Sequence, residues 1–339
     1  MQAEFKVRQR KIVRLSEETL VRTGFLDEEA QLPVLIEPAA EGVDLIGWAA
    51  GHRAELDAKL LAHGGILLRG FDVAGPEQFQ RFAAEVYGEL LDYKERAAPR
   101  VEVSKGVYTS TEFPPDQWIP LHHEMSYAHH WPRRILFYCD LPPQERGRTP
   151  IVRASRLMAR LDPGIRERFL ARKVMYVRNY GEGVDMSWQD AFQTTDRAAV
   201  EEYCGQAGMT AEWRPGDRLR TRTVRHAVMS HPETGEVIWF NHAHMFHSSN
   251  LPAEVREALR EQFQDDELPR NAFYGDGTPI ESSILEEIRQ AYLDASLLFP
   301  WRKGDILILD NFLMAHGREP FSGPRRILVS LSGLLRQAD

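Results

Sequence analysis

The feature that most constrains the fold is a pair of short polar motifs that lie far apart in the chain. His122 and Glu124 stand two positions apart in the first motif, and His316 lies in the second. In an extended segment, side chains at positions i and i+2 point to the same face, so this imidazole and this carboxylate should project together. Two histidines and one carboxylate form the facial triad that binds Fe(II) and leaves its other positions open. A strand that bears His316 is therefore expected beside the first motif.

A pair of arginines follows the second motif. Arg325 and Arg326 precede the apolar run Ile-Leu-Val. On an iron site of this kind, 2-oxoglutarate would chelate two open positions and O2 would take the last. The far carboxylate of 2-oxoglutarate then needs a fixed cation, and a planar guanidinium suits it because it makes two parallel hydrogen bonds. Adjacent residues on a strand face opposite ways, so only one of the two arginines should reach the site.

Further motifs accompany these residues in a specific order. They are Tyr-Thr-Ser-Thr at 108–111, Leu-His-His-Glu-Met-Ser-Tyr at 121–127, Gly-Arg-Thr-Pro at 147–150, Trp-Gln-Asp-Ala-Phe-Gln-Thr at 188–194, Trp-Phe-Asn at 239–241 and His-Gly-Arg-Glu-Pro-Phe at 316–321. With this set, the chain resembles the TauD/TfdA family of Fe(II)/2-oxoglutarate dioxygenases, and most of all its SyrP-like branch. The resemblance covers residues 64 to 333, which is most of the chain.

The resemblance implies a fold and a set of site residues. The fold is mainly β with flanking helices around a double-stranded β-helix, also called a distorted jelly roll, which scattered strands with long insertions suit. His122, Glu124 and His316 would bind the iron. Thr149 would contact a carboxylate of 2-oxoglutarate. The family's distal arginine falls on Arg326, with Arg325 as the alternative.

The resemblance also implies a reaction. It is hydroxylation of an unactivated C–H bond in an amino-acid, peptide-like or carrier-tethered aminoacyl substrate of specialised metabolism, with release of succinate and CO2. Glu124 favours hydroxylation over halogenation, because a halogenase leaves that position vacant for chloride. Desaturation or cyclisation at the same centre stays open. Two other classes also stay open: a zinc hydrolase, because two histidines and one glutamate also bind catalytic zinc, and a non-catalytic ligand-binding jelly roll.

Several other polar residues are candidates for the pocket. Tyr108, Asn241, Arg225 and Arg178 are candidate substrate contacts. Alternatively, Asn241 is an amide that is hydrogen-bonded in the core. The two arginines could instead be solvated, with their stems covering apolar surface. His123 lies between two ligands and should point away from the metal. The histidine-rich segment 241–247 has no nearby carboxylate, so we expect it to form a pocket wall rather than a second metal site.

Composition and net charge limit the possible binding partners and the cellular compartment of the protein. The net charge of −8 argues against nucleic acid as the main partner. No run of about 18 apolar residues predicts a membrane span, and the first residues lack an apolar signal core. The two cysteines do not make a disulfide framework and fit a reducing cytoplasm. The expected partner is a small-molecule or carrier-tethered substrate. No feature indicates an oligomeric state.

The chain is expected to form one 2-oxoglutarate dioxygenase domain over residues 1–339, with an N-terminal arm over about 1–41 and an insertion over about 181–215. Apolar spacing predicts helices at 43–62, 79–90, 157–171, 199–205, 252–263 and 279–295, the last with Thr278 as N-cap. It predicts strands at 64–70, 134–139, 174–180, 305–310 and 326–331.

Overall fold

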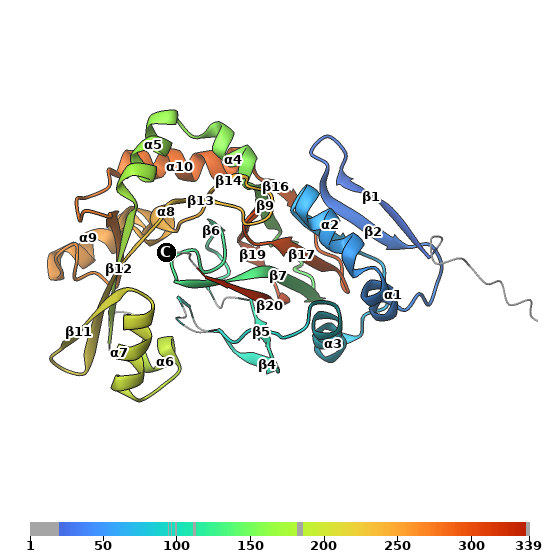
Figure 1. Cartoon of the computed structure of the whole chain (residues 1–339), viewed down its shortest axis with the longest axis horizontal. Helices are drawn as coiled ribbons and strands as arrows, with labels where there is room; N and C mark the ends of the chain where they lie inside the picture. Colours follow the sequence, from blue (N-terminus) through green and yellow to red (C-terminus); the bar gives the residue numbers. More distant parts are fainter. Residues whose placement is uncertain are drawn as a thin grey trace, which may run out of the picture.

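Two β-sheets that share one apolar core form the centre of the molecule (Figure 1). The computed structural model describes residues 20–93, 95, 97–98, 100–110, 113–181 and 186–336. The larger sheet has eight strands in the order β1-β2-β3-β17-β7-β20-β5-β4. These are β1 (Val21–Asp27), β2 (Leu32–Pro38), β3 (Gly65–Leu68), β17 (Ile306–Asp310), β7 (His130–Leu141), β20 (Arg326–Arg336), β5 (Val107–Thr109) and β4 (Glu102–Ser104).

The smaller sheet brings the two sequence motifs together. Its order is β16-β9-β18-β6, with β16 (Leu297–Phe299), β9 (Thr149–Arg153), β18 (Met314–Arg318) and β6 (Ile119–His122). On β18, His316 pairs with His122 on one side and with Ile151 on the other. The neighbouring strands required by the sequence are thus present.

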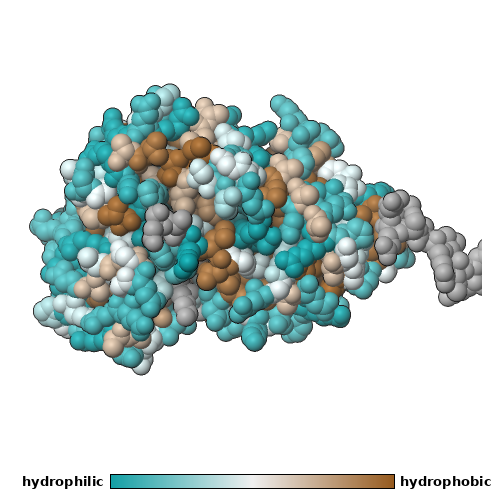
Figure 2. Space-filling view, in the orientation of Figure 1, coloured by the Kyte–Doolittle hydropathy of each residue, from teal (hydrophilic) through white to brown (hydrophobic). Residues whose placement is uncertain are grey.

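The central strands of the larger sheet are buried on both faces. On β20, Ile327 and Val329 pack in the core shared with the smaller sheet, whereas Leu328 packs in a second core on the opposite face. Three helices close that second core: α1 (Leu45–Gly51), α2 (Arg53–His63) and α3 (Gly75–Tyr87). In the space-filling view, hydrophobic residues show only as separate groups on a mostly hydrophilic face (Figure 2).

A third sheet carries the predicted insertion. Its order is β11-β12-β10-β15, with β11 (Met209–Arg214), β12 (Arg218–Arg225), β10 (Val174–Tyr180) and β15 (Arg270–Tyr274). The helices α6 (Trp188–Phe192) and α7 (Arg197–Gln206) pack with β11 in a small core of their own. This region lies at the opposite end of the molecule from β1 and β2 (Figure 1). Residues 182–185 of the insertion and 1–19 of the arm lie outside the described residues.

The remaining elements are two small strand pairs and further helices. The helices are α4 (Ala154–Arg160), α5 (Pro163–Arg172), α8 (Ala243–Phe246), the 3-10 helix η2 (Ser248–Asn250), α9 (Ala253–Gln262) and α10 (Ser282–Ala295). Of these, α4 and α10 pack against the smaller sheet. Two small antiparallel strand pairs are β8 (Glu145–Arg146) with β19 (Phe321–Ser322) and β13 (Val228–Ser230) with β14 (Val237–Trp239). The mainly β architecture with flanking helices is the one predicted.

Local differences from the prediction have identifiable causes. The helix expected at 157–171 is two helices, because Asp162 caps a new helix that begins at Pro163. The helix expected at 43–62 is likewise interrupted, at His52. The predicted cap at Thr278 is wrong: Pro279 forms a bridge with Phe273, and α10 begins only at Ser282. The described part of the expected N-terminal arm carries a hairpin of two strands, β1 and β2.

Candidate metal centre

The two histidines and the glutamate of the motifs converge in the structure. Glu124 Oε2 lies 3.8 Å from His122 Nε2 and 3.5 Å from His316 Nε2. All three residues are buried, and one ligand atom from each lies within 4.8 Å of the others. Across the described ranges, no other group of three histidines, cysteines or acidic residues is placed to hold a metal.

The donor atoms are oriented for a cation. His122 Nδ1 donates to the carbonyl of Pro120 at 2.8 Å, which leaves the lone pair of Nε2 directed at the cluster. Glu124 Oε2 is buried and has no hydrogen-bond partner among the described residues, and a buried charge normally has one. Ligands at right angles and about 2.1 Å from one ion lie about 3 Å apart. The observed spacings need to contract only slightly, so the residues fit a metal ion.

The protonation states also fit. Burial alone would raise the pKa of Glu124, but the charge of Arg100 and the adjacent imidazoles of His122 and His316 hold this pKa well below its usual range. Burial lowers the pKa of His316 to about 4. Near neutral pH the carboxylate is therefore ionised and the His316 imidazole is neutral, which are the forms that bind metals.

The backbone that carries Glu124 is held by Asn311. The Asn311 side chain accepts a hydrogen bond from Glu124 N at 2.7 Å and donates to Glu124 O and Pro132 O, both at 2.9 Å. Strand β6 ends at His122, and Met125 adopts a left-handed conformation with φ of 57°. Glu124 thus enters the site from a fixed turn, and not from the extended strand that the spacing argument assumed.

Three further histidines, His123, His242 and His244, make contacts that hold the turn after β6. His123 Nδ1 donates to Asn311 O at 2.7 Å, so this ring points away from the cluster as expected. His244 Nε2 lies 2.8 Å from Leu121 O, and His242 Nδ1 lies 2.6 Å from Ser126 Oγ. The histidine-rich segment therefore packs against the metal-binding turn.

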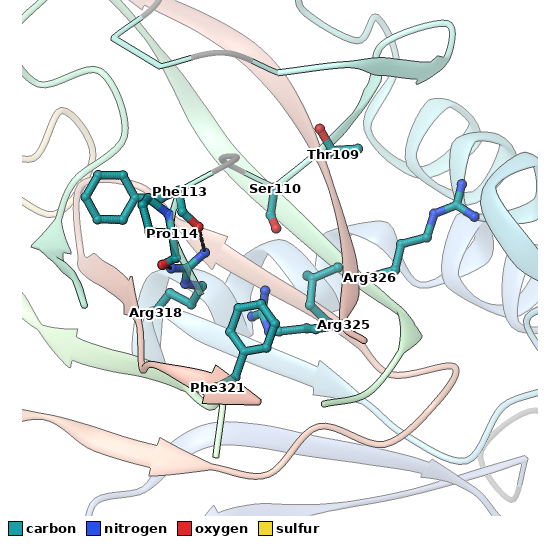
Figure 3. Close-up of a pocket in the computed structure, with 9 residues that line it drawn as sticks. Thr109, Ser110, Phe113, Pro114, Arg318, Phe321, Arg325 and Arg326 are labelled. Carbon is teal, nitrogen blue, oxygen red and sulfur yellow. Dashed lines mark hydrogen bonds between the residues drawn. The ribbon is translucent and has the colours of Figure 1, made fainter. Parts of the chain in front are cut away.

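A pocket opens beside the triad. Its lining includes Arg100, Ser110, Thr149, Arg318 and Arg325. Four of its residues also line a larger outer cavity of about 480 Å³, which Figure 3 shows. They are Ser110, Arg318, Arg325 and Ile327. The inner pocket and the outer cavity therefore adjoin.

The structure separates the two adjacent arginines, and it places Arg325, the alternative to Arg326, beside the triad. Arg325 lines the inner pocket, whereas Arg326 does not. Figure 3 shows Arg326 extending away from the side chains around Arg325. The Arg326 side chain is 46% exposed and pairs with Asp140 at 3.2 Å. Arg325 immediately precedes β20 and lines the inner pocket together with Ile327, two positions further along, as strand alternation would place them.

Thr149 and Arg325 are both poised in the inner pocket. Thr149 Oγ1 accepts a hydrogen bond from Trp301 Nε1 at 2.9 Å, so its own proton is left to donate. Arg325 Nε donates to Gly147 O at 3.2 Å. Burial lowers the pKa of Arg325 to about 10, and the guanidinium is still charged at neutral pH.

None of the four candidate substrate contacts lines the pocket beside the triad. Asn241 Nδ2 donates to Ala227 O at 3.0 Å, and its Oδ1 accepts from Ala243 N at 3.0 Å. Arg225 Nη2 donates to the carbonyl of Ala207 at 2.7 Å. The alternative of a hydrogen-bonded core amide thus accounts for Asn241, whereas Arg225 is buried outside the pocket and is not solvated.

Tyr108 and Arg178 are likewise held by aromatic neighbours. Tyr108 packs edge-on against Tyr93 in the core. The guanidinium of Arg178 stacks on the ring of Tyr180, with 4.6 Å from its carbon to the ring centre.

Sequence reasoning missed three residues near the metal. Arg318 had a signal, because position i+2 from His316 on one strand faces the same side. Asn311 also had one, since it belongs to the Asp-Asn pair that precedes the second motif. Arg100 lies in an irregular loop and had none.

The comparisons with known proteins identify the family. The family model described as "Taurine catabolism dioxygenase TauD, TfdA family" matches residues 30–331. The chain belongs to the TauD/TfdA family. The dapdiamide synthesis protein DdaC of Enterobacter agglomerans is 40% identical over 276 residues, which cover 81% of this chain and 84% of DdaC. A clavaminate synthase-like protein of Arabidopsis thaliana is 33% identical, with 81% and 83% covered.

Structural similarity supports the same fold. The crystal structure of PvcB from Pseudomonas aeruginosa matches with a TM-score of 0.55 at 20% identity, covering 95% of this chain and 94% of PvcB. The jelly-roll fold class of the TauD/TfdA family is therefore confirmed. Within the described residues, no helix is both long and apolar enough to cross a membrane.

Family membership decides the class of enzyme. This TauD/TfdA protein is a dioxygenase, not a zinc hydrolase or a binding module. The expected cofactors, Fe(II), 2-oxoglutarate and O2, are those of the family, and the His-Glu-His group fits the metal.

Proposed function

We propose that this dioxygenase hydroxylates an unactivated C–H bond of an amino-acid-derived or peptide-like substrate in specialised metabolism, with carrier-tethered aminoacyl groups among the substrates to be tested. The observation that carries the proposal is the buried triad with Glu124 as its acid. Because the carboxylate fills the third protein position, the open positions suffice for 2-oxoglutarate and O2 but leave none for a halide.

Each residue of the inner pocket has a role in this proposal. His122, Glu124 and His316 hold Fe(II). Bound iron supplies the redox chemistry that couples oxidative decarboxylation of 2-oxoglutarate to oxidation of the substrate. The Arg325 guanidinium binds the distal carboxylate of 2-oxoglutarate, and the Thr149 hydroxyl donates to one of its carboxylate oxygens. One oxygen atom of O2 enters succinate and the other enters the product as a hydroxyl group.

The charge of the pocket supports an acidic substrate. Among the described residues that line the inner pocket, three arginines, Arg100, Arg318 and Arg325, accompany one carboxylate, that of Glu124. Fe(II) and the dianion of 2-oxoglutarate cancel each other, so the loaded pocket stays positive. A substrate with a free carboxylate, as in an amino acid, would therefore be attracted. The name of the relative DdaC, a dapdiamide synthesis protein, also supports a role in the synthesis of a specialised small product.

The test is a mass-shift assay with a binding control. Purified protein is first mixed anaerobically with Fe(II) and 2-oxoglutarate, and a visible charge-transfer band is expected. Air and a set of amino acids, dipeptides and their methyl esters are then added. We expect a free-carboxylate substrate to gain one oxygen atom in step with succinate release. Loss of two hydrogens would indicate desaturation or cyclisation instead.

A matched pair of variants makes the assay specific. His316→Gln should abolish the band and the succinate, because it removes a ligand. His63→Gln should keep both, because His63 lies at the end of α2 and lines neither cavity. Absence of the band and of succinate in the iron-loaded wild type would refute the proposal.

A further inference from the structure

The loop between α3 and β4 brings a third cationic side chain to the metal centre. Arg100 Nη2 lies 3.2 Å from Glu124 Oε1, and both side chains are nearly buried, with 8% and 7% exposed. The Arg100 guanidinium also stacks over the ring of Tyr93, with 4.2 Å from its carbon to the ring centre. This ion pair joins an irregular loop directly to a metal ligand.

The two oxygens of Glu124 therefore face different partners. Oε1 accepts from Arg100. Oε2 faces His122 and His316 and has no hydrogen-bond partner among the described residues. Carboxylates bind metal ions through one oxygen or through both. Here, one oxygen is engaged by a guanidinium before any metal arrives, and the other is left for the metal.

The number of oxygens that bind decides how many positions stay open. Three single-atom protein ligands leave three positions on a six-coordinate iron, two for 2-oxoglutarate and one for O2. A carboxylate that bound through both oxygens would take one of these three. Cosubstrate and O2 would then compete for the two that are left.

We propose that Arg100 is a positioning residue that keeps Glu124 bound to iron through Oε2 alone. The inference rests on the proposed iron site, but not on the identity of the substrate. Arg100 touches neither the reacting atoms nor the metal in this arrangement. It acts through Glu124: it binds Oε1, so that this oxygen does not bind the metal.

The loop is fastened at two residues between Tyr93 and Arg100. Glu95 O accepts from the Tyr127 hydroxyl at 2.7 Å, and Glu95 Oε2 accepts from the Tyr203 hydroxyl at 2.9 Å. Ala97 O accepts from Arg270 Nη1 at 3.1 Å. These contacts tie the loop to the metal-binding turn, to α7 and to β15. A fixed loop can hold a guanidinium at one oxygen of a carboxylate, whereas a loose one could not.

The decisive experiment compares metal coordination in the wild type and in Arg100→Met. Anaerobic crystals with Fe(II) or with Mn(II) as its substitute show whether one or both Glu124 oxygens contact the ion. We expect one oxygen in the wild type and two in Arg100→Met. One oxygen in both proteins, or two in the wild type, would overturn the proposal.

A solution measurement gives an independent readout. The affinity for 2-oxoglutarate is measured from the visible band of the anaerobic Fe(II) protein. Loss of a hydrogen-bond partner behind a metal ligand typically lowers metal affinity or activity 10–100-fold. By analogy, we expect the affinity for 2-oxoglutarate to fall at least about tenfold in Arg100→Met. Arg100→Lys keeps the charge but not the planar fork, and it should fall between the two. An affinity within about twofold of the wild type in Arg100→Met would contradict the inference.

Two controls separate this inference from other failures. Arg81→Met removes an arginine that also pairs with a glutamate, Glu85, but on the exposed face of α3, and it should leave the affinity for 2-oxoglutarate unchanged. If the wild type itself forms no band, the proposed iron site fails and not the role of Arg100. If Arg100→Met does not fold, the Arg100→Lys comparison decides: an unchanged affinity there refutes the role, and a weakened one supports it.

Discussion

Replacing Arg325 with alanine should weaken the binding of 2-oxoglutarate by about a hundredfold. Its guanidinium lines the inner pocket and keeps its charge despite burial. Hydrogen bonds between charged groups contribute about 1.5–3 kcal/mol each. Two parallel bonds to one carboxylate, discounted because the pocket opens to an outer cavity, give about 3 kcal/mol. At 1.4 kcal/mol for each factor of ten, this is a factor of about a hundred.

The neighbouring Arg326 offers a matched control for this experiment. Its side chain is exposed and pairs with Asp140, and surface ion pairs contribute only about 0–1 kcal/mol. Arg326→Ala should therefore change the affinity less than about threefold. Both variants are titrated with 2-oxoglutarate in the anaerobic Fe(II) protein, and their folding is checked by circular dichroism. A larger loss in Arg326→Ala than in Arg325→Ala would refute the parity argument.

Three further predictions follow from local geometry. Burial lowers the pKa of His244 to about 3, so below its usual pKa of about 6.5 the unfolded chain binds more protons than the folded one. Stability of the metal-free protein should then fall as pH drops from 6.5 toward 5, and a urea midpoint that stays constant over this range would contradict this. Asn311→Ala should reduce the free energy of unfolding by about 3 kcal/mol, measured in urea, because it leaves buried main-chain groups of the metal-binding turn without partners. A Cβ on Gly317 would lie 2.6 Å from Ile119 O, so Gly317→Ala should push β18 from β6 and weaken Fe(II) binding, measured by anaerobic titration. Gly205→Ala on α7, where a Cβ meets nothing within 4 Å, should not.

The metal ligands could be predicted because their chemistry leaves a pattern in the sequence. An imidazole and a carboxylate two positions apart, with a second imidazole in a distant motif, already point to one kind of centre. Strand β10 (Val174–Tyr180) was predicted with both ends correct. The division of a helix at Pro163 was missed because apolar spacing continued through it, although Asp-Pro is a start signal.

The alternation of apolar and polar residues could not show which of the two arginines, Arg325 or Arg326, faces the pocket. A strand with one solvated face shows apolar and polar residues in turn, but Ile327, Leu328 and Val329 are all apolar because both faces of β20 are buried. The sequence therefore did not indicate which face belonged to the pocket. Only the division of these side chains between two cores shows that Arg325, and not Arg326, shares the inner face.

No sequence rule predicts the loop residues of the site. Asn311 and Arg100 act on Glu124 from segments that are neither helix nor strand, so no periodicity marks them. Their effect depends on the direction in which the turn after β6 points the Glu124 carboxylate. That direction is set by the pairing of β6 with β18. The ligand triad can be predicted from residue types alone. The number of coordination positions that stay open for 2-oxoglutarate and O2 depends on contacts between remote segments. Relatives that share the triad could therefore differ in how tightly they bind 2-oxoglutarate, according to what stands opposite the second oxygen of the glutamate.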